Sequence, residues 1–341
     1  MTRRILILGC NGFIGHHLVE RILSTTDWHI AGLDVRDDRI QHHLSNPRLA
    51  YKQASMMDSH PWISEQLKTC DTMLPLVAIA TPSTYVSDPL RVFELDFEAN
   101  LAVVRLCVAA KKRVIFPSTS EVYGMCTDAQ FDPDTSHFIQ GPINKPRWIY
   151  STSKQLLDRV IHAYGMAGLD YTLFRPFNWI GAGLDTIENP APGSARVISQ
   201  FLGHIWRGEN ISLVNGGEQK RAFMYVDDAI VALMKIIDNE NGIAKAKIYN
   251  IGNPTENHSI KTLAERMVAL AAHYPVFAQG AKKTQIVTIS SDEYYGKGYQ
   301  DVQHRVPKID NTMRELNWKP TIDLNGALTR IFDAYAKQLK A

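Results

Sequence analysis

Tyr150 and Lys154 lie four positions apart in the stretch Tyr-Ser-Thr-Ser-Lys. On a helix this spacing places both side chains on one face. An ammonium beside a phenol favours the phenolate, so we expect Lys154 to lower the pKa of Tyr150 and let it act as a general base. The pair alone is a weak signal, because Tyr-x-x-x-Lys arises by chance in many helices. It gains meaning from a glycine-rich turn at residues 9–15 and a hydroxyl-rich stretch at residues 116–124.

The glycine-rich turn reads Gly-Cys-Asn-Gly-Phe-Ile-Gly, after an apolar run at residues 4–8 and before a helical pattern at residues 16–24. Such glycines permit a tight turn, close approach of the backbone to a pyrophosphate, and close packing of helix on strand. The helix N-terminus then faces the phosphates. A plain strand–turn–helix connection is the alternative, but the order of these elements favours dinucleotide binding. The residues predicted to hold the cofactor here are Gly9, Asn11, Gly12, Phe13, Ile14 and Gly15.

Asp34 ends a predicted strand at residues 28–34. It falls about 20 residues after the turn, where dinucleotide-binding units carry the carboxylate that binds the ribose. A carboxylate repels the 2′-phosphate of NADP, so Asp34 favours NAD, although the nearby Arg36 could accept that phosphate and Asp34 could be only a strand-end cap. Small residues at 77–82, among them Ala78, follow another predicted strand and suit a loop that packs against the dinucleotide.

Composition narrows the class of protein. The chain has 341 residues, 45% hydrophobic and 21% charged, and a net charge of +2, which gives no bias toward nucleic acid or acidic membranes. The four cysteines, Cys10, Cys70, Cys107 and Cys126, lack metal-type spacing. We therefore expect reduced thiols, no metal and a cytoplasmic location. No apolar run is long enough to span a bilayer, and the N-terminus reads as a strand rather than a signal peptide.

Strands alternate with helices along the first half of the chain. Strands are predicted at residues 4–8, 28–34, 48–54, 72–76, 113–117 and 171–175, and helices at residues 16–24, 61–68, 89–111 and 150–165. This alternation predicts an α/β fold with a doubly wound parallel sheet of the Rossmann type.

The regular alternation ends near Asn178, and the Gly- and Pro-rich residues 181–193 predict a loop. Shorter elements follow, with helices near residues 195–207, 226–239, 263–272 and 324–339 and strands at residues 211–214 and 249–252. We expect an NAD-binding domain at residues 1–177. Residues 178–341 are expected to form mainly a smaller C-terminal substrate-binding lobe, with some segments returning to the first domain.

Four motifs together resemble the extended short-chain dehydrogenases/reductases that act on nucleotide sugars. They are the glycine turn, Ser-Thr-Ser-Glu-Val-Tyr-Gly at 118–124, Tyr150 with Lys154, and Arg-Pro-Phe-Asn at 175–178. Residues 76–82, 144–150 and 294–305 are more closely similar to the UDP-glucuronic acid decarboxylase half of the ArnA family. The likeness covers nearly the whole chain, and its last stretch is specific because general epimerases lack it. The formyltransferase half of that family is absent, so we expect a stand-alone decarboxylase.

The resemblance implies NAD-dependent oxidation of UDP-glucuronic acid at carbon 4 and loss of carbon dioxide, which gives UDP-4-keto-pentose. It implies a homodimer in which helices 89–111 and 150–165 pair. Glu121 and Arg305 would serve the decarboxylation as base and acid, and Thr119 would bind near carbon 4. Tyr150 and Lys154 would also contact the cofactor, with Lys154 at its ribose. The residues that the resemblance places around the sugar nucleotide are Ala80, Tyr85, Thr119, Ser120, Arg147, Asn178, Arg196, Arg221 and Tyr299.

Other activities remain open at this point. A UDP-xylose synthase would use the same residues and then return the hydride to the 4-keto-pentose. Arg305 disfavours a nucleotide-sugar epimerase or dehydratase, and the presence of both Tyr150 and Lys154 disfavours a non-catalytic NAD-binding regulator. Arg196 and Arg221 could be surface charges.

Two departures from related families bear on the cofactor and the product. Ser55 stands where the ArnA family has an acid near the adenine, which could alter cofactor binding. Ala80 and Ser120 stand where the similar UDP-apiose/xylose synthases have cysteines tied to ring contraction. The apiose reaction is therefore disfavoured.

Overall fold

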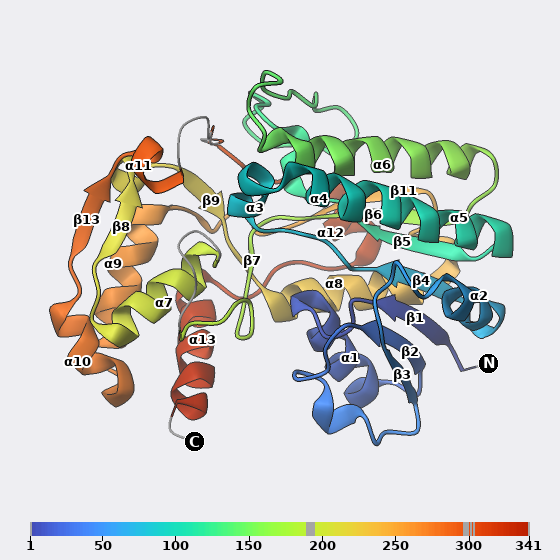
Figure 1. The fold of residues 1–341 in the computed structure, drawn as a ribbon, viewed down its shortest axis with the longest axis horizontal. Coiled ribbons are helices and arrows are strands. Elements are labelled where there is room, and N and C mark those ends of the chain that lie inside the picture. Colours follow the sequence, from blue (N-terminus) through green and yellow to red (C-terminus); the bar gives the residue numbers. More distant parts are fainter. Residues whose placement is uncertain (1, 189–194, 296–299, 301, 303, 340–341) are drawn as a thin grey trace.

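The computed structural model describes residues 2–188, 195–295, 300, 302 and 304–339 (Figure 1). These residues form a central seven-stranded sheet in the order β11-β6-β5-β4-β1-β2-β3, and every pairing in it is parallel. The strands are β1 Arg4–Leu8, β2 His29–Asp34, β3 Leu49–Gln53, β4 Thr72–Pro75, β5 Arg113–Pro117, β6 Tyr171–Pro176 and β11 Lys247–Ile251. The reversal of strand order beside β1 confirms the predicted doubly wound Rossmann sheet.

Helices cover both faces of this sheet. Because successive side chains of a strand point to opposite faces, each strand contributes to two apolar clusters, one on each side of the sheet. Ile5 and Ile7 of β1 pack into the same apolar cluster as α1 (Phe13–Thr25) and α8 (Val226–Asp238). Leu6 and Leu8 face the opposite cluster, with α2 (His60–Thr69), α5 (Asn100–Ala110) and α6 (Trp148–Met166). Figure 1 shows α5 and α6 along one face and α1 and α8 along the other. Burial on both faces explains why these strands read as continuous apolar runs.

The predicted helix at residues 89–111 is interrupted. The chain forms α4 (Pro89–Phe93), a π-helical segment η2 (Glu94–Ala99) and then α5, preceded by the short helix α3 (Pro82–Ser87). π-Helical segments are rare and are frequent at functional sites. Asp96 lies within this segment and is completely buried.

Most of the remaining elements come after residue 178. Helices α7 Val197–Arg207, α9 Ile260–Ala271, α10 Pro275–Lys283, α11 Ser291–Tyr295 and α13 Leu324–Gln338, with β8 Ile211–Val214 and β13 Ile286–Ile289, gather beside the sheet (Figure 1). Two further strand pairs are β7 Trp179–Ile180 with β10 Met224–Tyr225 and β9 Lys220–Ala222 with β12 Asn257–Ser259. The other pieces are α12 Asp310–Leu316 and the 3₁₀ turns η1 Gln41–His43, η3 Ser120–Tyr123, η4 Asn215–Gly217 and η5 Glu240–Gly242.

Part of the later chain returns to the sheet, because β11 pairs with β6 and α8 packs against α1. The division into two domains at residue 177 stays a prediction. Across the described ranges, no helix is both long and apolar enough to cross a lipid bilayer.

Candidate active site

A cavity of about 520 Å³ opens at the carboxyl ends of the strands, between the sheet and the later lobe. A second cavity, of about 330 Å³, adjoins the glycine turn. The first is lined by every residue predicted to be catalytic and by most of those predicted to bind cofactor or substrate: Gly9, Gly12, Phe13, Ile14, Gly15, Ala78, Ala80, Tyr85, Thr119, Ser120, Glu121, Tyr150, Lys154, Asn178, Arg196, Arg221 and Arg305. Asp34 and Ser55 line the second. The site is thus assembled from segments that lie up to 296 residues apart, from Gly9 to Arg305.

The glycine turn at residues 9–15 forms a concave backbone surface, called the cradle below, which larger residues at the glycine positions would fill. Gly9 has a φ of +86°, which strongly favours glycine. A Cβ on Gly15 would lie 2.1 Å from the Gly9 carbonyl oxygen. Asp34 is fixed at the edge of the cradle, because its Oδ2 accepts from the Asn11 amide at 2.9 Å and its Oδ1 from the Val35 amide at 2.8 Å. A cavity bounded by glycine backbone at one end and a strand-end carboxylate at the other fits a dinucleotide.

Asn11 does not face either cavity. Its side-chain amide donates to Asp38 at 2.9 Å, and its carbonyl oxygen accepts from the Arg39 amide at 2.8 Å. It therefore braces the segment after β2. Arg36, which could have favoured NADP, lies 3.7 Å from Asp38 with its side chain 71% exposed.

Tyr150 lies in a closed aromatic setting. Its ring stacks on Tyr85 with centroids 4.6 Å apart and planes 6° from parallel. Burial raises the pKa of the Tyr150 phenol, the Asp96 carboxylate raises it further, and a hydrogen bond with Thr119 opposes them. The expected lowering of this pKa by Lys154 is therefore not found.

The reason lies in the partner of Lys154. Its ammonium is 3.3 Å from Asp96 Oδ1, and the two side chains are 1% and 0% exposed. Burial raises the pKa of Asp96 and the ammonium acts to lower it. The Asp96 carboxylate thus offsets most of the electrostatic effect that the Lys154 ammonium was expected to have on the pKa of Tyr150.

Asp96 was missed by the sequence analysis. It lies four residues from both Val92 and Asn100, which are buried. A lone acid on the apolar face of a predicted amphipathic helix was the signal that could have found it.

Glu121 is held by arginines. Its Oε1 lies 2.7 Å from Arg305 Nη1 and its Oε2 lies 2.5 Å from Arg147 Nη2. Burial acts to raise the pKa of Glu121, but Arg305, Arg147 and Arg221 together hold it at about 2. The carboxylate is therefore ionised at neutral pH.

Arg147 pairs with Glu121 but does not itself line the cavity. Its guanidinium packs over the Trp148 ring, 4.8 Å from the centroid, and donates to the Gln300 carbonyl oxygen at 2.5 Å. Arg305, by contrast, lines the cavity, and its buried Nε has no hydrogen-bond partner among the described residues. Arg305 thus lines the cavity with its Nη1 held by Glu121.

The other predicted substrate residues have mixed surroundings. Arg196 lines the cavity, but its Nη2 pairs with Asp185 Oδ1 at 2.7 Å. Arg221 donates from Nη1 to the Val302 carbonyl oxygen at 2.9 Å. Asn178 takes a positive φ of 41°, which Asn tolerates, at the start of the later lobe. Tyr299 lies outside the described residues.

The later lobe supplies cavity residues that the sequence analysis did not single out: Leu184, Ile198, Gln200, Phe201, Ser212, Val214, Gln219, Phe223, Ile260 and Tyr294. They come from α7, the four-residue strand β8, the first residue of α9, the short helix α11 and the loops between elements. Such short segments give no periodic signal that would separate a ligand contact from the core.

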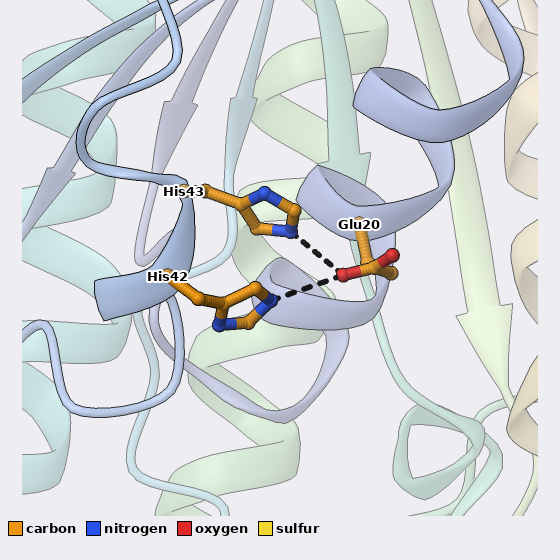
Figure 2. A group of neighbouring side chains, drawn as sticks. All are labelled: Glu20, His42 and His43. Atoms are coloured by element: carbon orange, nitrogen blue, oxygen red, sulfur yellow. Dashed lines mark hydrogen bonds and ion pairs between the residues drawn. The ribbon is translucent and has the colours of Figure 1, made fainter.

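Figure 2 shows a group of possible metal ligands outside both cavities. Glu20 Oε2 lies 3.2 Å from His42 Nε2 and 2.7 Å from His43 Nε2, and these ligand atoms all lie within 4.8 Å of one another. Glu20 and His42 are largely exposed. The two hydrogen bonds account for this arrangement without an ion.

Known proteins are similar along the whole chain. The model of the NAD dependent epimerase/dehydratase family matches residues 5–252. The crystal structure of PbgP3 protein from Burkholderia pseudomallei is 56% identical, with a TM-score of 0.91, covering 100% of this chain and 98% of that one.

Two more distant structures share the fold. UDP-glucuronic acid 4-epimerase from Bacillus cereus, in complex with UDP-glucuronic acid and NAD, is 20% identical with a TM-score of 0.78, covering 98% of this chain and 99% of that one. dTDP-glucose 4,6-dehydratase from Bacillus anthracis, in complex with NAD, is 16% identical with a TM-score of 0.79, covering 99% and 98%.

Proposed function

Because the chain belongs to the NAD-dependent epimerase/dehydratase family, we propose that it oxidises UDP-glucuronic acid at carbon 4 and decarboxylates the product to UDP-4-keto-pentose. The observation that carries this proposal is the pair of Glu121 and Arg305, 2.7 Å apart, in the same cavity as Tyr150 and Thr119. An oxidation alone needs a hydroxyl-binding group and a base. The added cation suits a step in which negative charge develops on a ketone oxygen.

The cofactor is NAD, as in the rest of this family. The glycine turn would hold its pyrophosphate, Asp34 its adenosine ribose, and Lys154 the second ribose, with Ala78 in the loop that covers it. When bound, NAD⁺ supplies the hydride acceptor and a positively charged ring. Burial keeps the Tyr150 phenol protonated in the protein alone, so added positive charge in the cavity favours its deprotonation.

In the oxidation, the Tyr150 oxygen would take the proton of the carbon-4 hydroxyl while Thr119 hydrogen-bonds the same oxygen. The ketone formed at carbon 4 makes the sugar a β-keto acid. The bond between carbon 5 and the carboxylate then breaks, and its electron pair moves onto the ketone oxygen as an enolate. Carbon dioxide leaves, Arg305 would stabilise the enolate with its positive charge, and a proton from water is finally added to carbon 5.

We propose for Glu121 a different role from the general base that the resemblance implied. A carboxylate whose pKa is held at about 2 accepts a proton poorly at neutral pH. It is better suited to orient Arg305 and to accept hydrogen bonds from a water or sugar hydroxyl. Arg196, Arg221 and Arg147 would supply positive charge for the diphosphate and the carboxylate, and Ala80, Tyr85, Ser120 and Asn178 would line the sugar pocket. A homodimer and a cytoplasmic location are part of the proposal.

Product analysis tests it. The protein is incubated with UDP-glucuronic acid and NAD⁺, and carbon dioxide, NADH and the sugar nucleotide are measured. Equal amounts of carbon dioxide and NADH, with UDP-4-keto-pentose, are expected. Carbon dioxide with UDP-xylose and no net NADH would identify a UDP-xylose synthase instead. A product that keeps its carboxylate would contradict both.

A further inference from the structure

The ion pair between Lys154 and Asp96 is the most deeply buried charge pair beside the cavity. The ammonium nitrogen and the carboxylate Oδ1 are 3.3 Å apart. Beyond this pair, Lys154 Nζ has no hydrogen-bond partner among the described residues, and the ring of Phe116 lies 5.0 Å away. A lysine surrounded in this way needs a counter-charge to remain an ammonium.

Asp96 also holds the loop that covers the cavity. Its Oδ2 accepts from the Ile79 amide at 2.9 Å. One turn later, Asn100 Nδ2 donates to the Val77 carbonyl oxygen at 3.1 Å. Asp96 lies in the π-helical segment η2, and its carboxylate contacts both Lys154 and the loop that carries Ala78. Ala78 lines both cavities.

We propose that Asp96 is a positioning residue for the cofactor, which keeps Lys154 charged and aimed at the cavity while it anchors the loop at residues 77–80. It acts through Lys154 and does not line either cavity itself. The inference rests on the proposed role of Lys154 in holding the cofactor. It does not depend on which sugar nucleotide is the substrate.

The other ionisable groups around Lys154 do not replace Asp96. Tyr150 and Asp158 lie on the same helix, and Asp158 pairs with Arg175 at 3.3 Å. Glu121 of η3 forms ion pairs with Arg305 and Arg147. The remaining groups that act on this region are Tyr85 of α3 and Arg196, which precedes α7. Asp96 is thus the one carboxylate within ion-pair distance of Lys154 among the residues described.

The first test replaces only the charge. In Asp96→Asn the side-chain oxygen can still accept from the Ile79 amide, but Lys154 becomes a buried cation without a counter-ion. The unfolding free energy of Asp96→Asn at pH 7.5 should therefore fall well below that of wild type. The double variant Asp96→Asn/Lys154→Met, which carries neither charge, should recover most of this loss.

The second test measures NAD⁺ affinity by titration calorimetry at pH 7.5. Asp96→Asn is expected to weaken binding about tenfold, the effect of one lost charge–ligand interaction. The double variant Asp96→Asn/Lys154→Met should bind no more weakly than Lys154→Met alone, because Asp96 acts through Lys154. Asp228→Asn is the matched control: Asp228 is a buried carboxylate that anchors a remote loop through the amides of Thr321 and Ile322, and its loss should leave NAD⁺ affinity unchanged.

An Asp96→Asn affinity within about twofold of wild type, or additive effects in the double variant, would overturn the proposal. If Asp96→Asn does not fold but the double variant folds, the uncompensated lysine is the cause and the proposal holds. If neither folds, Asp96 is a framework residue and the proposal fails. Wild-type NAD⁺ affinity in Lys154→Met would refute the role of Lys154, while the stability comparison still decides whether Asp96 keeps it charged.

Discussion

Tyr150 is the residue on which the proposed oxidation depends. Tyr150→Phe keeps the ring that stacks on Tyr85 and removes only the acid–base oxygen. NADH formation from UDP-glucuronic acid should fall by about a hundredfold or more, while NAD⁺ affinity stays within about twofold, since no cofactor-binding ring atom is lost. Tyr164→Phe, on the same helix and outside the cavity, should keep wild-type turnover. Unchanged turnover in Tyr150→Phe would exclude it as the base.

Arg305 is the residue that separates the decarboxylase from a sugar dehydrogenase. Arg305→Met keeps the length of the side chain but removes the charge beside the cavity, and carbon dioxide release should fall by a factor on the order of hundreds. The measurement uses synthetic UDP-4-keto-glucuronic acid, which bypasses the oxidation. Arg314→Met, at an exposed arginine of α12, is the control. Normal release by Arg305→Met would leave this residue only a binding role.

Glu121 gives a pH dependence with a definite sign. Its pKa is about 2 in the folded protein, against 4.5 for an unperturbed glutamate, so its ionised form stabilises the fold above pH 4.5. This contribution, on the order of 3 kcal/mol, is lost as the pH falls from about 4.5 toward 2. Between pH 5 and pH 3 the unfolding free energy of wild type should therefore fall more steeply than that of Glu121→Gln. Parallel curves from denaturant titrations would show that the arginines do not depress this pKa.

At the scale of the element, the glycine turn and α1 act as one unit. Gly15 lies inside α1, where alanine normally stabilises a helix by up to about 1 kcal/mol. Here the added methyl would lie 2.1 Å from the Gly9 carbonyl oxygen and 2.8 Å from the Cys10 backbone. Gly15→Ala should therefore lower the melting temperature and weaken NAD⁺ binding at least tenfold. Ser24→Ala, at an exposed position of the same helix, should do neither. Wild-type NAD⁺ affinity in Gly15→Ala would contradict the proposal that the glycine turn binds the cofactor.

The same elements show what the sequence could and could not predict. The strand at Arg4–Leu8, the glycine turn and the acid at Asp34 each carry a strong local signal, because burial on both faces and close backbone approach restrict the residue types. The interruption of the helix at 89–111 carries no such signal, since a π-helical turn needs no change of composition. Asp96 was not singled out, and Lys154 was expected to act on Tyr150 and on the cofactor ribose.

At the scale of the whole molecule, contacts between residues far apart in the sequence are what the sequence alone predicts least well. The contact of Glu121 with Arg305 joins residues 184 positions apart, and nothing local in either segment specifies it. The family resemblance predicted that both residues serve one site. It did not predict that Glu121 has a lowered pKa and forms an ion pair with Arg305. The later lobe was predicted least well, because β7, β9 and β10 have two or three residues each and too few positions to show a period.

The outer surfaces of α5 and α6 are the basis of the last prediction, the homodimer. Both helices lie on the same face of the sheet (Figure 1). Among the apolar residues of these two helices, Val104 and Leu157 are buried in the core beneath, whereas Leu156 is 46% exposed and Leu101, Leu106 and Val160 are partly exposed. The chain thus has apolar side chains left over on this face after its own core is packed.

We expect sedimentation velocity to show a dimer at micromolar concentration. Leu156→Glu should produce a monomer, because a two-fold symmetric interface would contain the buried charge twice. Leu44→Glu, at a leucine that is 37% exposed just after η1, should leave the dimer intact, so that a general effect of added charge is separated from a local one. A wild-type monomer, or a Leu156→Glu dimer as tight as wild type, would mean that this face does not pair, since a buried carboxylate without a partner costs too much to be tolerated at an interface.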